Sequence, residues 1–227
     1  MMEQYLPLLA QTALFHGLTE EELRRTLDCL GAAKKTYPKL GFLLRAGDHT
    51  PAMGVMLSGS ALLVQEDLWE RRNIVAKVEP GDTFAEAFAA AGGAINLSVV
   101  ANEDCEALML DLNRVLTLCP SACPSHSKLV HNLVTVLAQK LLVLNDKITH
   151  MSRQTTQEKL LSYLSAQAQR QGKLTFDIPY DRQQLADYLC VDRAAMSAEL
   201  SKLQKKGLLS CRRNHFTLFT PAPSEGL

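Results

Sequence analysis

The sequence has no excess of charge of either sign, because 24 Lys and Arg residues balance 24 Asp and Glu residues over 227 positions. This balance excludes a protein that coats a polyanion along its whole length, as histones do. No uncharged stretch reaches about 18 apolar residues, the length that a membrane span requires. The longest candidate, residues 87–102, is interrupted by Gly92-Gly93 and Asn96. We therefore expect a protein without a membrane partner.

The N-terminus lacks the basic and then apolar layout of a signal peptide. We therefore expect a cytoplasmic protein whose six cysteines remain thiols. Internal repeats and low-complexity tracts are missing as well. With 47% hydrophobic and 21% charged residues, the chain has enough apolar material for one large domain or two ordinary ones.

The first half of the chain combines a helical start with a series of short β-prone segments. Thr19 and Glu22 form a capping box ahead of Leu23, Leu27 and Leu30, which follow helical spacing. Beyond residue 37, turn signals separate short apolar segments, and this alternation predicts a small antiparallel barrel. The expected strands are 42–45, 54–57, 61–65, 74–78, 97–101 and 107–110.

The middle of the chain has no Gly or Pro from Ser125 to Gln171. Apolar residues recur there at alternating steps of four and three, the pattern of a coiled-coil seam, which implies a partner helix. The predicted seam consists of Val130, Val134, Leu137, Leu141, Leu144, Ile148 and Met151. A second stripe beside the seam is expected to pack against the helix's own barrel and consists of Leu129, Leu133, Val136 and Val143. The alternative is one wide core-facing surface in a monomer.

The charge is unevenly divided between the two parts of the chain. Residues 152–227 hold 11 Lys and Arg against 7 Asp and Glu, whereas residues 1–151 hold 13 against 17. A basic C-terminal part is typical of a phosphate-facing surface, although ordinary solvated charge is the alternative.

That basic part contains the motif that is most informative about function. Asp181 and Asp192 are placed as N-caps of two short helices, joined through Cys190-Val191, with the small Ala186 where the helices would cross. The second helix is expected to end at Lys206-Gly207. Two β-prone segments, 208–211 and 215–219, then predict a two-stranded wing. The shared core is expected to consist of Leu185, Leu189, Val191, Met196, Leu200 and Leu203.

A helix-turn-helix presents the first turns of its second helix to the major groove of DNA. Arg193 stands at the first helical position, where it could donate two hydrogen bonds to guanine. Its alternative role is that of a solvated charge. Ser197, between small residues, would allow close approach to the groove. Residues flanking this face are predicted phosphate contacts, namely Arg182, Gln183, Lys202, Lys205, Arg212 and Arg213.

The stretch 181–209 resembles the winged helix-turn-helix of the CRP/FNR superfamily, and Pro80-Gly81-Asp82-Thr83-Phe84-Ala85-Glu86 is similar to that family's cyclic-nucleotide-like barrel. The resemblance implies an α+β fold: an N-terminal antiparallel jelly-roll barrel (1–118), a long dimerisation helix (119–151) and a DNA-binding domain (152–227). It further implies a homodimeric transcription regulator whose two second helices read a palindromic site of double-stranded DNA about 34 Å apart. RNA polymerase is left open as a partner.

Departures from the family pattern bear on the effector. Glu86 matches the family's ribose-binding Glu, but the position of the phosphate-binding Arg falls on Ile95 or Asn96, and no Lys or Arg occurs from Val78 to Asn113. A buried phosphate without a cation is unfavourable. Cyclic AMP bound in the usual way is therefore disfavoured, the small effector is unknown, and Glu86 could instead cap or brace the barrel. Cys190 replaces a common Gly, which predicts strain in the turn.

Three further side chains could form a metal or redox site. Cys119, Cys123 and His126 lie within eight residues of one another and could ligate zinc or iron or form a redox pair. The alternative is that they are buried structural residues. With only Cys29 in the first hundred residues, an N-terminal iron-sulfur cluster is not supported.

Three classes of function compete as interpretations of the whole chain: an enzyme, an interaction protein and a DNA-binding regulator. A thiol- or metal-dependent enzyme would rest on Cys119, Cys123 and His126, but no phosphate-binding loop or nucleophile elbow accompanies them. A dimeric interaction protein with a vestigial helix-turn-helix is a further alternative. We predict a DNA-binding regulator that is not an enzyme.

Overall fold

The structure, a computed structural model, describes residues 3–66, 69, 72–116 and 124–219. The chain forms two compact units, Met1–Leu141 and Leu142–Leu227, and the boundary falls inside one long helix. The fold class predicted from the sequence is confirmed, and each unit is described by itself.

Short helices begin the first unit. A 3₁₀ turn (η1, Glu3–Tyr5) and helix α1 (Leu6–Gln11) precede helix α2 (Glu20–Cys29). The predicted capping box is present, because Thr19 Oγ1 accepts from the amide of Glu22 and the Glu22 carboxylate accepts from the amide of Thr19. Leu23 and Leu27 are buried, as their spacing predicted.

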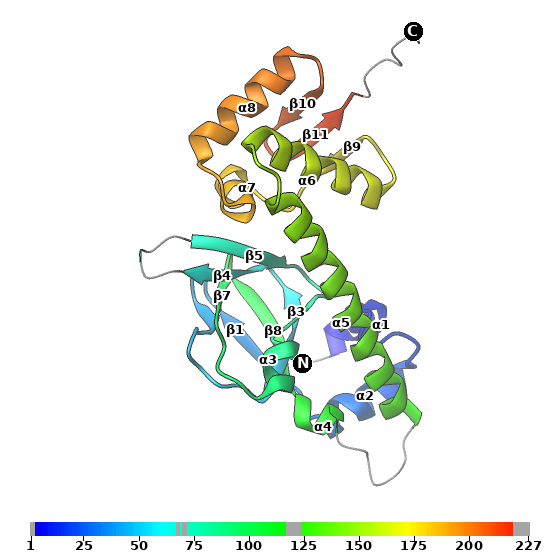
Figure 1. Cartoon of the computed structure of the whole chain (residues 1–227). Coiled ribbons are helices and arrows are strands. Elements are labelled where there is room, and N and C mark those ends of the chain that lie inside the picture. The colour runs from blue at the N-terminus through cyan, green and yellow to red at the C-terminus, as the bar shows by residue number, and fades with distance from the viewer. Residues whose placement is uncertain (1–2, 67–68, 70–71, 117–123, 220–227) are drawn as a thin grey trace. The chain divides into compact units, whose positions relative to one another are not determined.

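Two four-stranded antiparallel sheets form the barrel of the first unit (Figure 1). One sheet has the order β1-β8-β3-β6, with bounds Ala33–Tyr37, Cys105–Asp111, Ala52–Ser58 and Thr83–Phe84. The other has the order β2-β7-β4-β5, with bounds Phe42–Leu44, Ser98–Ala101, Ala61–Glu66 and Arg72–Val78. All six predicted strands are present. Strands β1 and β6 were not predicted, because β1 is mostly exposed and polar and β6 has two residues.

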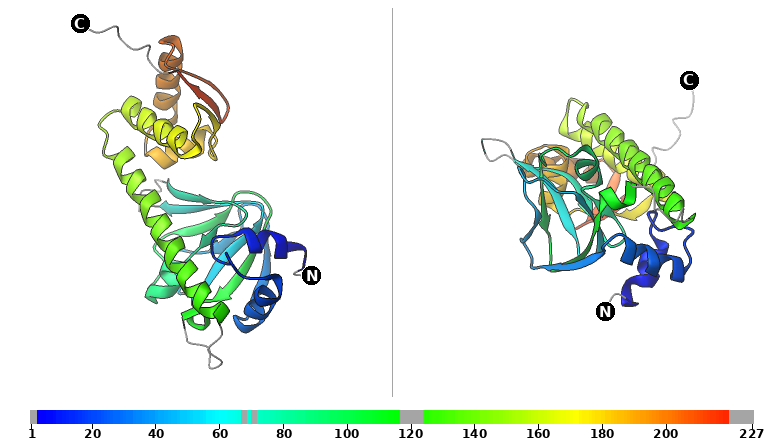
Figure 2. Two further views of the ribbon diagram at one scale, coloured as in Figure 1. Left: turned by 90° about the vertical axis from the view of Figure 1, so that its right-hand side faces the viewer. Right: turned by 90° about the horizontal axis from the view of Figure 1, so that it is seen from below.

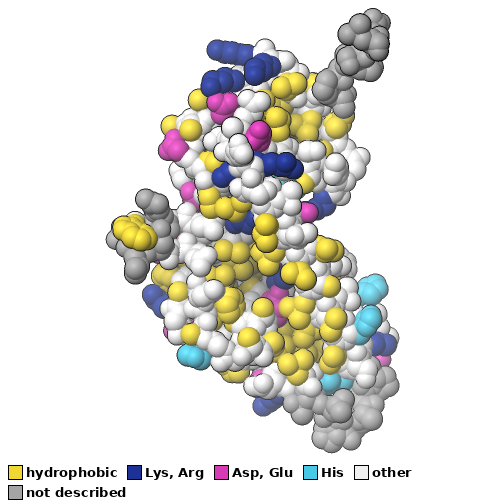
Figure 3. Space-filling view, in the orientation of Figure 1, with side chains coloured by type: hydrophobic (Ala, Val, Ile, Leu, Met, Phe, Trp, Pro, Cys, Tyr) yellow, Lys and Arg dark blue, Asp and Glu magenta, His cyan; other side chains and the backbone are white. Residues whose placement is uncertain are grey.

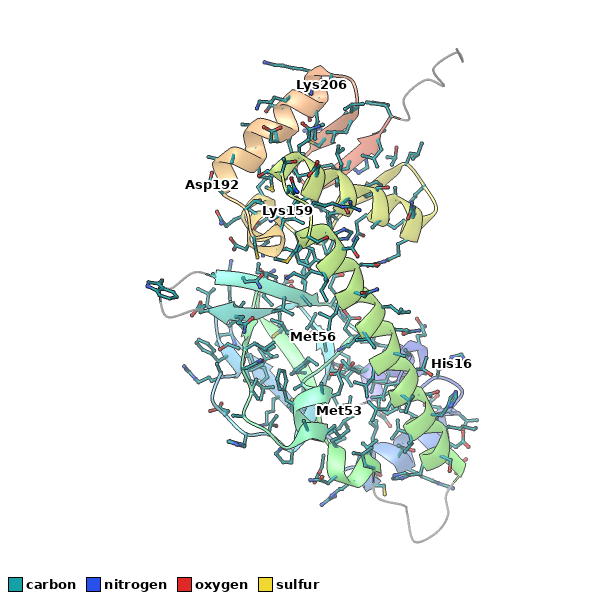
Figure 4. The ribbon with its side chains drawn as sticks, in the orientation of Figure 1. His16, Met53, Met56, Lys159, Asp192 and Lys206 are labelled. Carbon is teal, nitrogen blue, oxygen red and sulfur yellow. The ribbon has the colours of Figure 1, made fainter. Side chains whose placement is uncertain are left out.

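Strand β3 separates two hydrophobic clusters because its side chains alternate between the faces of the sheet. Met56 packs between the sheets with Phe84 and Val99, whereas Met53 packs with the helices on the outer face (Figure 4). Gly54 also faces the interior, and a Cβ at this position would lie 2.0 Å from the Phe84 ring. A glycine is therefore required here.

Helix α3 (Glu86–Ala91) lies between β6 and β7, and helices α4 (Leu112–Leu116) and the long α5 (Pro124–Met151) follow the last barrel strand. The first half of α5 lies along the first unit, where Leu129, Leu133 and Val136 are buried (Figure 2). The Asn132 side-chain amide donates to the carbonyls of Leu14 and His16 at 3.0 and 2.8 Å. The predicted packing stripe is thus confirmed for three residues, but it is wrong for Val143, which is 42% exposed.

The second unit contains helices α6 (Thr156–Gln171), α7 (Arg182–Leu189) and α8 (Arg193–Lys205) and strands β9 (Thr175–Asp177), β10 (Leu209–Arg212) and β11 (His215–Leu218). The predicted two-stranded wing is present and gains a third strand, since the sheet order is β10-β11-β9. Helix α6 begins with a capping box between Thr155 and Glu158 that the sequence analysis overlooked. The polar Ser152–Thr155 link is what separates α6 from α5.

Candidate nucleic-acid interface and barrel site

Helices α7 and α8 form the predicted helix-turn-helix. Asp181 Oδ1 accepts from the amide of Gln184, and Asp192 Oδ1 accepts from the amide of Ala195, both at 2.8 Å. Each carboxylate therefore satisfies an amide that would otherwise lack a partner and complements the helix dipole. Figure 4 labels Asp192 and Lys206 at the two ends of α8.

The turn between the two helices has a strained backbone. Cys190 has φ 51° and ψ 54°, a left-handed conformation that favours glycine, as its place in the sequence predicted. It ends α7, with its amide bonded to the carbonyls of Ala186 and Asp187. Ala186 is fully buried where the helices cross, so the small side chain allows close packing. The turn fixes where α8 begins.

The first turns of α8 expose a narrow polar surface between small side chains. Arg193, Ala194, Ser197 and Ala198 are all exposed. The Ser197 hydroxyl donates to the carbonyl of Arg193 at 2.9 Å, so its oxygen still has capacity to accept a hydrogen bond. This surface places one long donor, Arg193, beside residues that do not obstruct approach.

Basic side chains continue toward the C-terminal end of α8, where Figure 3 shows Lys and Arg side chains gathered. Lys202 Nζ lies 2.6 Å from Glu199 Oε1, while Lys205 is exposed. Arg212 at the end of β10 and Arg213 in the turn before β11 are exposed, and Arg213 has φ 56°. The predicted phosphate contacts of α8 and the wing thus face solvent.

Two residues predicted as phosphate contacts lie at the start of α7. Arg182 turns inward: its guanidinium donates to Cys211 Sγ at 3.1 Å and lies 5.2 Å from the centre of the Phe216 ring. Cys211 Sγ in turn donates to Gln204 Oε1 at 2.7 Å. This chain of contacts ties α7 to α8 and to the wing. Gln183 is exposed, and its amide donates to Asp187 at 2.8 Å.

The predicted seam of α5 is largely open in the single chain. Val134, Leu141, Leu144 and Ile148 are 61%, 68%, 43% and 66% exposed, whereas Val130, Leu137 and Met151 are half-buried. By length and composition alone, residues 125–151 could also cross a membrane, and 17% of the most apolar stretch of this helix is buried. A row of exposed apolar side chains at heptad spacing equally fits a helix covered by a second copy.

A buried acidic site lies in the barrel at the start of α3. Glu86 is 3% exposed, and its Oε1 lies 2.5 Å from the ammonium of Lys140 on α5. The same ammonium donates to the carbonyl of Thr83 at 2.5 Å. Nearby, burial raises the pKa of Asp82, whose carboxylate accepts from the amide of Glu79. Glu86 was predicted from the sequence, whereas Lys140 was not, because the pair is separated by 54 positions in sequence and only the packing of α5 brings it together.

Of the three residues of the predicted metal or redox site, the structure describes only His126. Cys119 and Cys123 lie outside the described residues. His126 is 9% exposed, and its Nε2 lies 2.8 Å from the carbonyl oxygen of Val115, which occupies one of its two ring nitrogens. Within the described ranges no group of three or more His, Cys, Asp and Glu side chains could hold a metal ion. The metal or redox site stays a prediction.

Comparisons with known proteins match both units. The Crp-like helix-turn-helix domain matches residues 158–222, and the cyclic nucleotide-binding domain matches residues 34–121. The "Cyclic AMP receptor protein" of Thermus thermophilus is 27% identical over 197 residues, which cover 86% of this chain and 87% of that protein.

Solved structures share the fold at low identity. The c-di-GMP responsive global regulator CLP of Xanthomonas campestris has a TM-score of 0.70 and 19% identity, covering 89% of this chain and 100% of that chain. A CooA mutant from Carboxydothermus hydrogenoformans has a TM-score of 0.67 and 18% identity, covering 91% and 94%.

Proposed function

The chain belongs to the CRP/FNR family of DNA-binding transcription regulators, and we propose on that premise that it acts as a homodimer that reads a palindromic DNA site. The family is not enzymatic, so the sites described above are sites of binding. The functional organisation that we propose is a sensor barrel (1–118), a dimerisation helix (119–151) and a DNA-binding domain (152–227), acting in the cytoplasm.

The observation that carries this proposal is the exposed start of α8. Arg193 follows the Asp192 cap directly, and its small neighbours would let the helix enter the major groove. A guanidinium at this place can donate two hydrogen bonds to the O6 and N7 atoms of one guanine. Arg193 is therefore the proposed base reader, and Ser197 is the proposed second groove contact.

Phosphate contacts would fix the orientation of α8 without reading sequence. We assign this role to the exposed side chains of Gln183, Lys202, Lys205, Arg212 and Arg213. Arg182 was predicted to share it, but its guanidinium is directed at Cys211 and Phe216. We therefore propose that Arg182 positions α7 against the wing rather than contacting DNA.

Two copies would pair through the exposed seam of α5. Pairing along the seam would bury Leu141, Leu144 and Ile148, which a single chain leaves more than two-fifths exposed. Two copies of α8 separated by about 34 Å would then meet successive major grooves on one face of the duplex. The palindrome follows from this two-fold symmetry.

The barrel is proposed as a sensor that does not bind cyclic AMP in the usual way. Although the Thermus relative is named a cyclic AMP receptor, the barrel sequence from Val78 to Asn113 contains no Lys or Arg to pair a cyclic phosphate. An unpaired phosphate there would meet the buried carboxylate of Glu86 and the neighbouring carboxylate of Asp82. We therefore propose Glu86 as a ligand-binding residue only for an effector that, unlike cyclic AMP, carries no negative charge.

The function is tested by fluorescence anisotropy with labelled genomic DNA fragments at two salt concentrations. Counterion release makes all binding salt-dependent, so a regulator should bind every fragment weakly and a few fragments much more tightly. Equal affinity for all fragments at both salt concentrations would rule out sequence-specific recognition and favour a dimeric interaction protein.

A further inference from the structure

Helix α5 sends one charged side chain into the barrel's acidic site. The Lys140 ammonium contacts Glu86 Oε1 and the carbonyl oxygen of Thr83, both at 2.5 Å, so it joins strand β6 and helix α3 to the middle of α5. The Glu86 side chain is 4% exposed and that of Lys140 is 39% exposed, so the carboxylate is buried while the lysine stem reaches in from outside. In Figure 3 a small acidic spot lies among hydrophobic side chains on the barrel face.

The site is only half satisfied by this contact. Glu86 Oε2 and Thr83 Oγ1 are buried without a hydrogen-bond partner among the described residues. The backbone before Glu86 is also strained, since Ala85 has φ 64° and ψ 3°, a conformation that L-residues rarely adopt. Strain and unpaired buried polar atoms concentrate at functional sites. The site therefore has the features of a binding site, and its contact with the chain's own ammonium fills part of it.

The charge at the site depends on α5. No Lys or Arg occurs in the barrel sequence from Val78 to Asn113, whereas Asp82 and Glu86 contribute two acidic groups. A carboxylate buried away from water needs a cation or several donors to remain ionised. Lys140 supplies a cation that residues 78–113 do not contain.

The position of Lys140 on α5 links the site to the proposed dimer seam. Lys140 lies one turn from Leu137 and Leu144 and next to Leu141. Leu133 and Val136 lie two turns and one turn before Lys140 on the same side of the helix and are buried in the core of the first unit. A fixed Lys140 therefore restricts the rotation of α5 that determines where the seam residues point.

We propose that Lys140 is the built-in occupant of the barrel site, where its ammonium takes the place of an external effector and holds the α5 seam in the orientation that dimerisation needs. The dimer then forms without added ligand. A small molecule able to displace Lys140 would have to donate hydrogen bonds to Glu86 and carry no negative charge. This proposal goes beyond the proposed function and rests on it only for the role of the seam.

The test compares variants of the full-length chain by sedimentation equilibrium, with thermal unfolding as a separate readout. Lys140→Met and Glu86→Gln should each lower the unfolding midpoint and weaken the dimer by about tenfold or more, because one polar partner is left buried. Lys140→Arg, which keeps the charge, should stay close to the wild-type dimer affinity.

The double variant Glu86→Gln/Lys140→Met separates positioning from charge balance. With neither charge present, the unfolding midpoint should recover, because a pair replaced by neutral groups leaves no unpaired ion. The dimer should remain weak, since the contact of Lys140 with the barrel no longer restricts the rotation of α5. Recovery of both properties would show that the pair only balances charge, which would overturn the proposal.

Lys128→Met is the matched control. Lys128 is also on α5, donates to the carbonyl of Gly17 at 3.1 Å and lies 3.7 Å from the Glu22 carboxylate, which is 31% exposed rather than buried. Its loss should leave the dimer unchanged, and an effect as large as that of Lys140→Met would contradict the proposal. A wild-type chain that is monomeric would instead refute the proposed function, so the two failures are distinguishable.

Discussion

Single residues decide what this protein can read on DNA, and Arg193 carries the sharpest prediction. Replacing Arg193 by Ala should reduce the free energy of binding to the specific site by about 1–3 kcal/mol, because a bidentate contact to guanine is lost. Binding to unrelated DNA should change little. The measurement is anisotropy on both duplexes at one salt concentration, and an equal loss on random DNA would make Arg193 a phosphate contact.

Lys147 gives a prediction about pH at the residue scale. It is 7% exposed, with its ammonium 4.4 Å from the centre of the Tyr188 ring. Burial lowers the pKa of Lys147 from 10.5 to about 8. Between these values the unfolded lysine binds a proton that the folded lysine does not, so stability rises with pH.

We expect the free energy of unfolding to gain about 2 kcal/mol from this residue between about pH 7.5 and 9.5. Urea unfolding at both pH values measures this gain, and Lys147→Met should lack it. This pH range ends below the pH at which the buried tyrosines ionise, since burial raises the pKa of Tyr188 to about 12 and that of Tyr163 well above its usual value. Both tyrosines lower the stability of the folded chain only at higher pH. Equal pH dependence in both proteins would show that Lys147 is not desolvated.

At the scale of elements, we propose that assembly depends on α5. Leu137→Lys or Leu144→Lys should dissociate the dimer at micromolar protein, because either change places a charge in the apolar seam. Sedimentation velocity measures the result. Leu142→Lys is the matched control, since Leu142 is 65% exposed and lies outside the seam. A dimer that persists in both seam variants would place the interface elsewhere.

Elements were predictable where local signals agree with the tertiary structure. The caps at Thr19, Asp181 and Asp192 were correctly placed because capping depends on neighbouring residues alone. Strand β1 was missed because its residues show no apolar alternation and its pairing with β8 is a long-range contact. Strand β9 was missed for a similar reason, since only its pairing with β11 defines it.

At the scale of the whole molecule, the neutral chain combines an acidic N-terminal part with a basic C-terminal part. That division suits a protein whose second unit alone contacts a polyanion. The proposed sensor residues lie in the acidic part, whereas the proposed DNA contacts lie in the basic part. A regulator of this design needs two copies, because one α8 contacts too few base pairs to specify a site.

The sequence by itself determined the succession of barrel, long helix and helix-turn-helix, the caps at Thr19, Asp181 and Asp192, and the absence of Lys and Arg from residues 78–113, because each depends on residue type and short spacing. Only the tertiary structure decided that Arg182 turns toward Cys211, that Val143 is exposed and that Lys140 meets Glu86. These outcomes depend on which surfaces pack together over long sequence separations. Periodicity within one segment contains no information about a partner that lies more than fifty residues away.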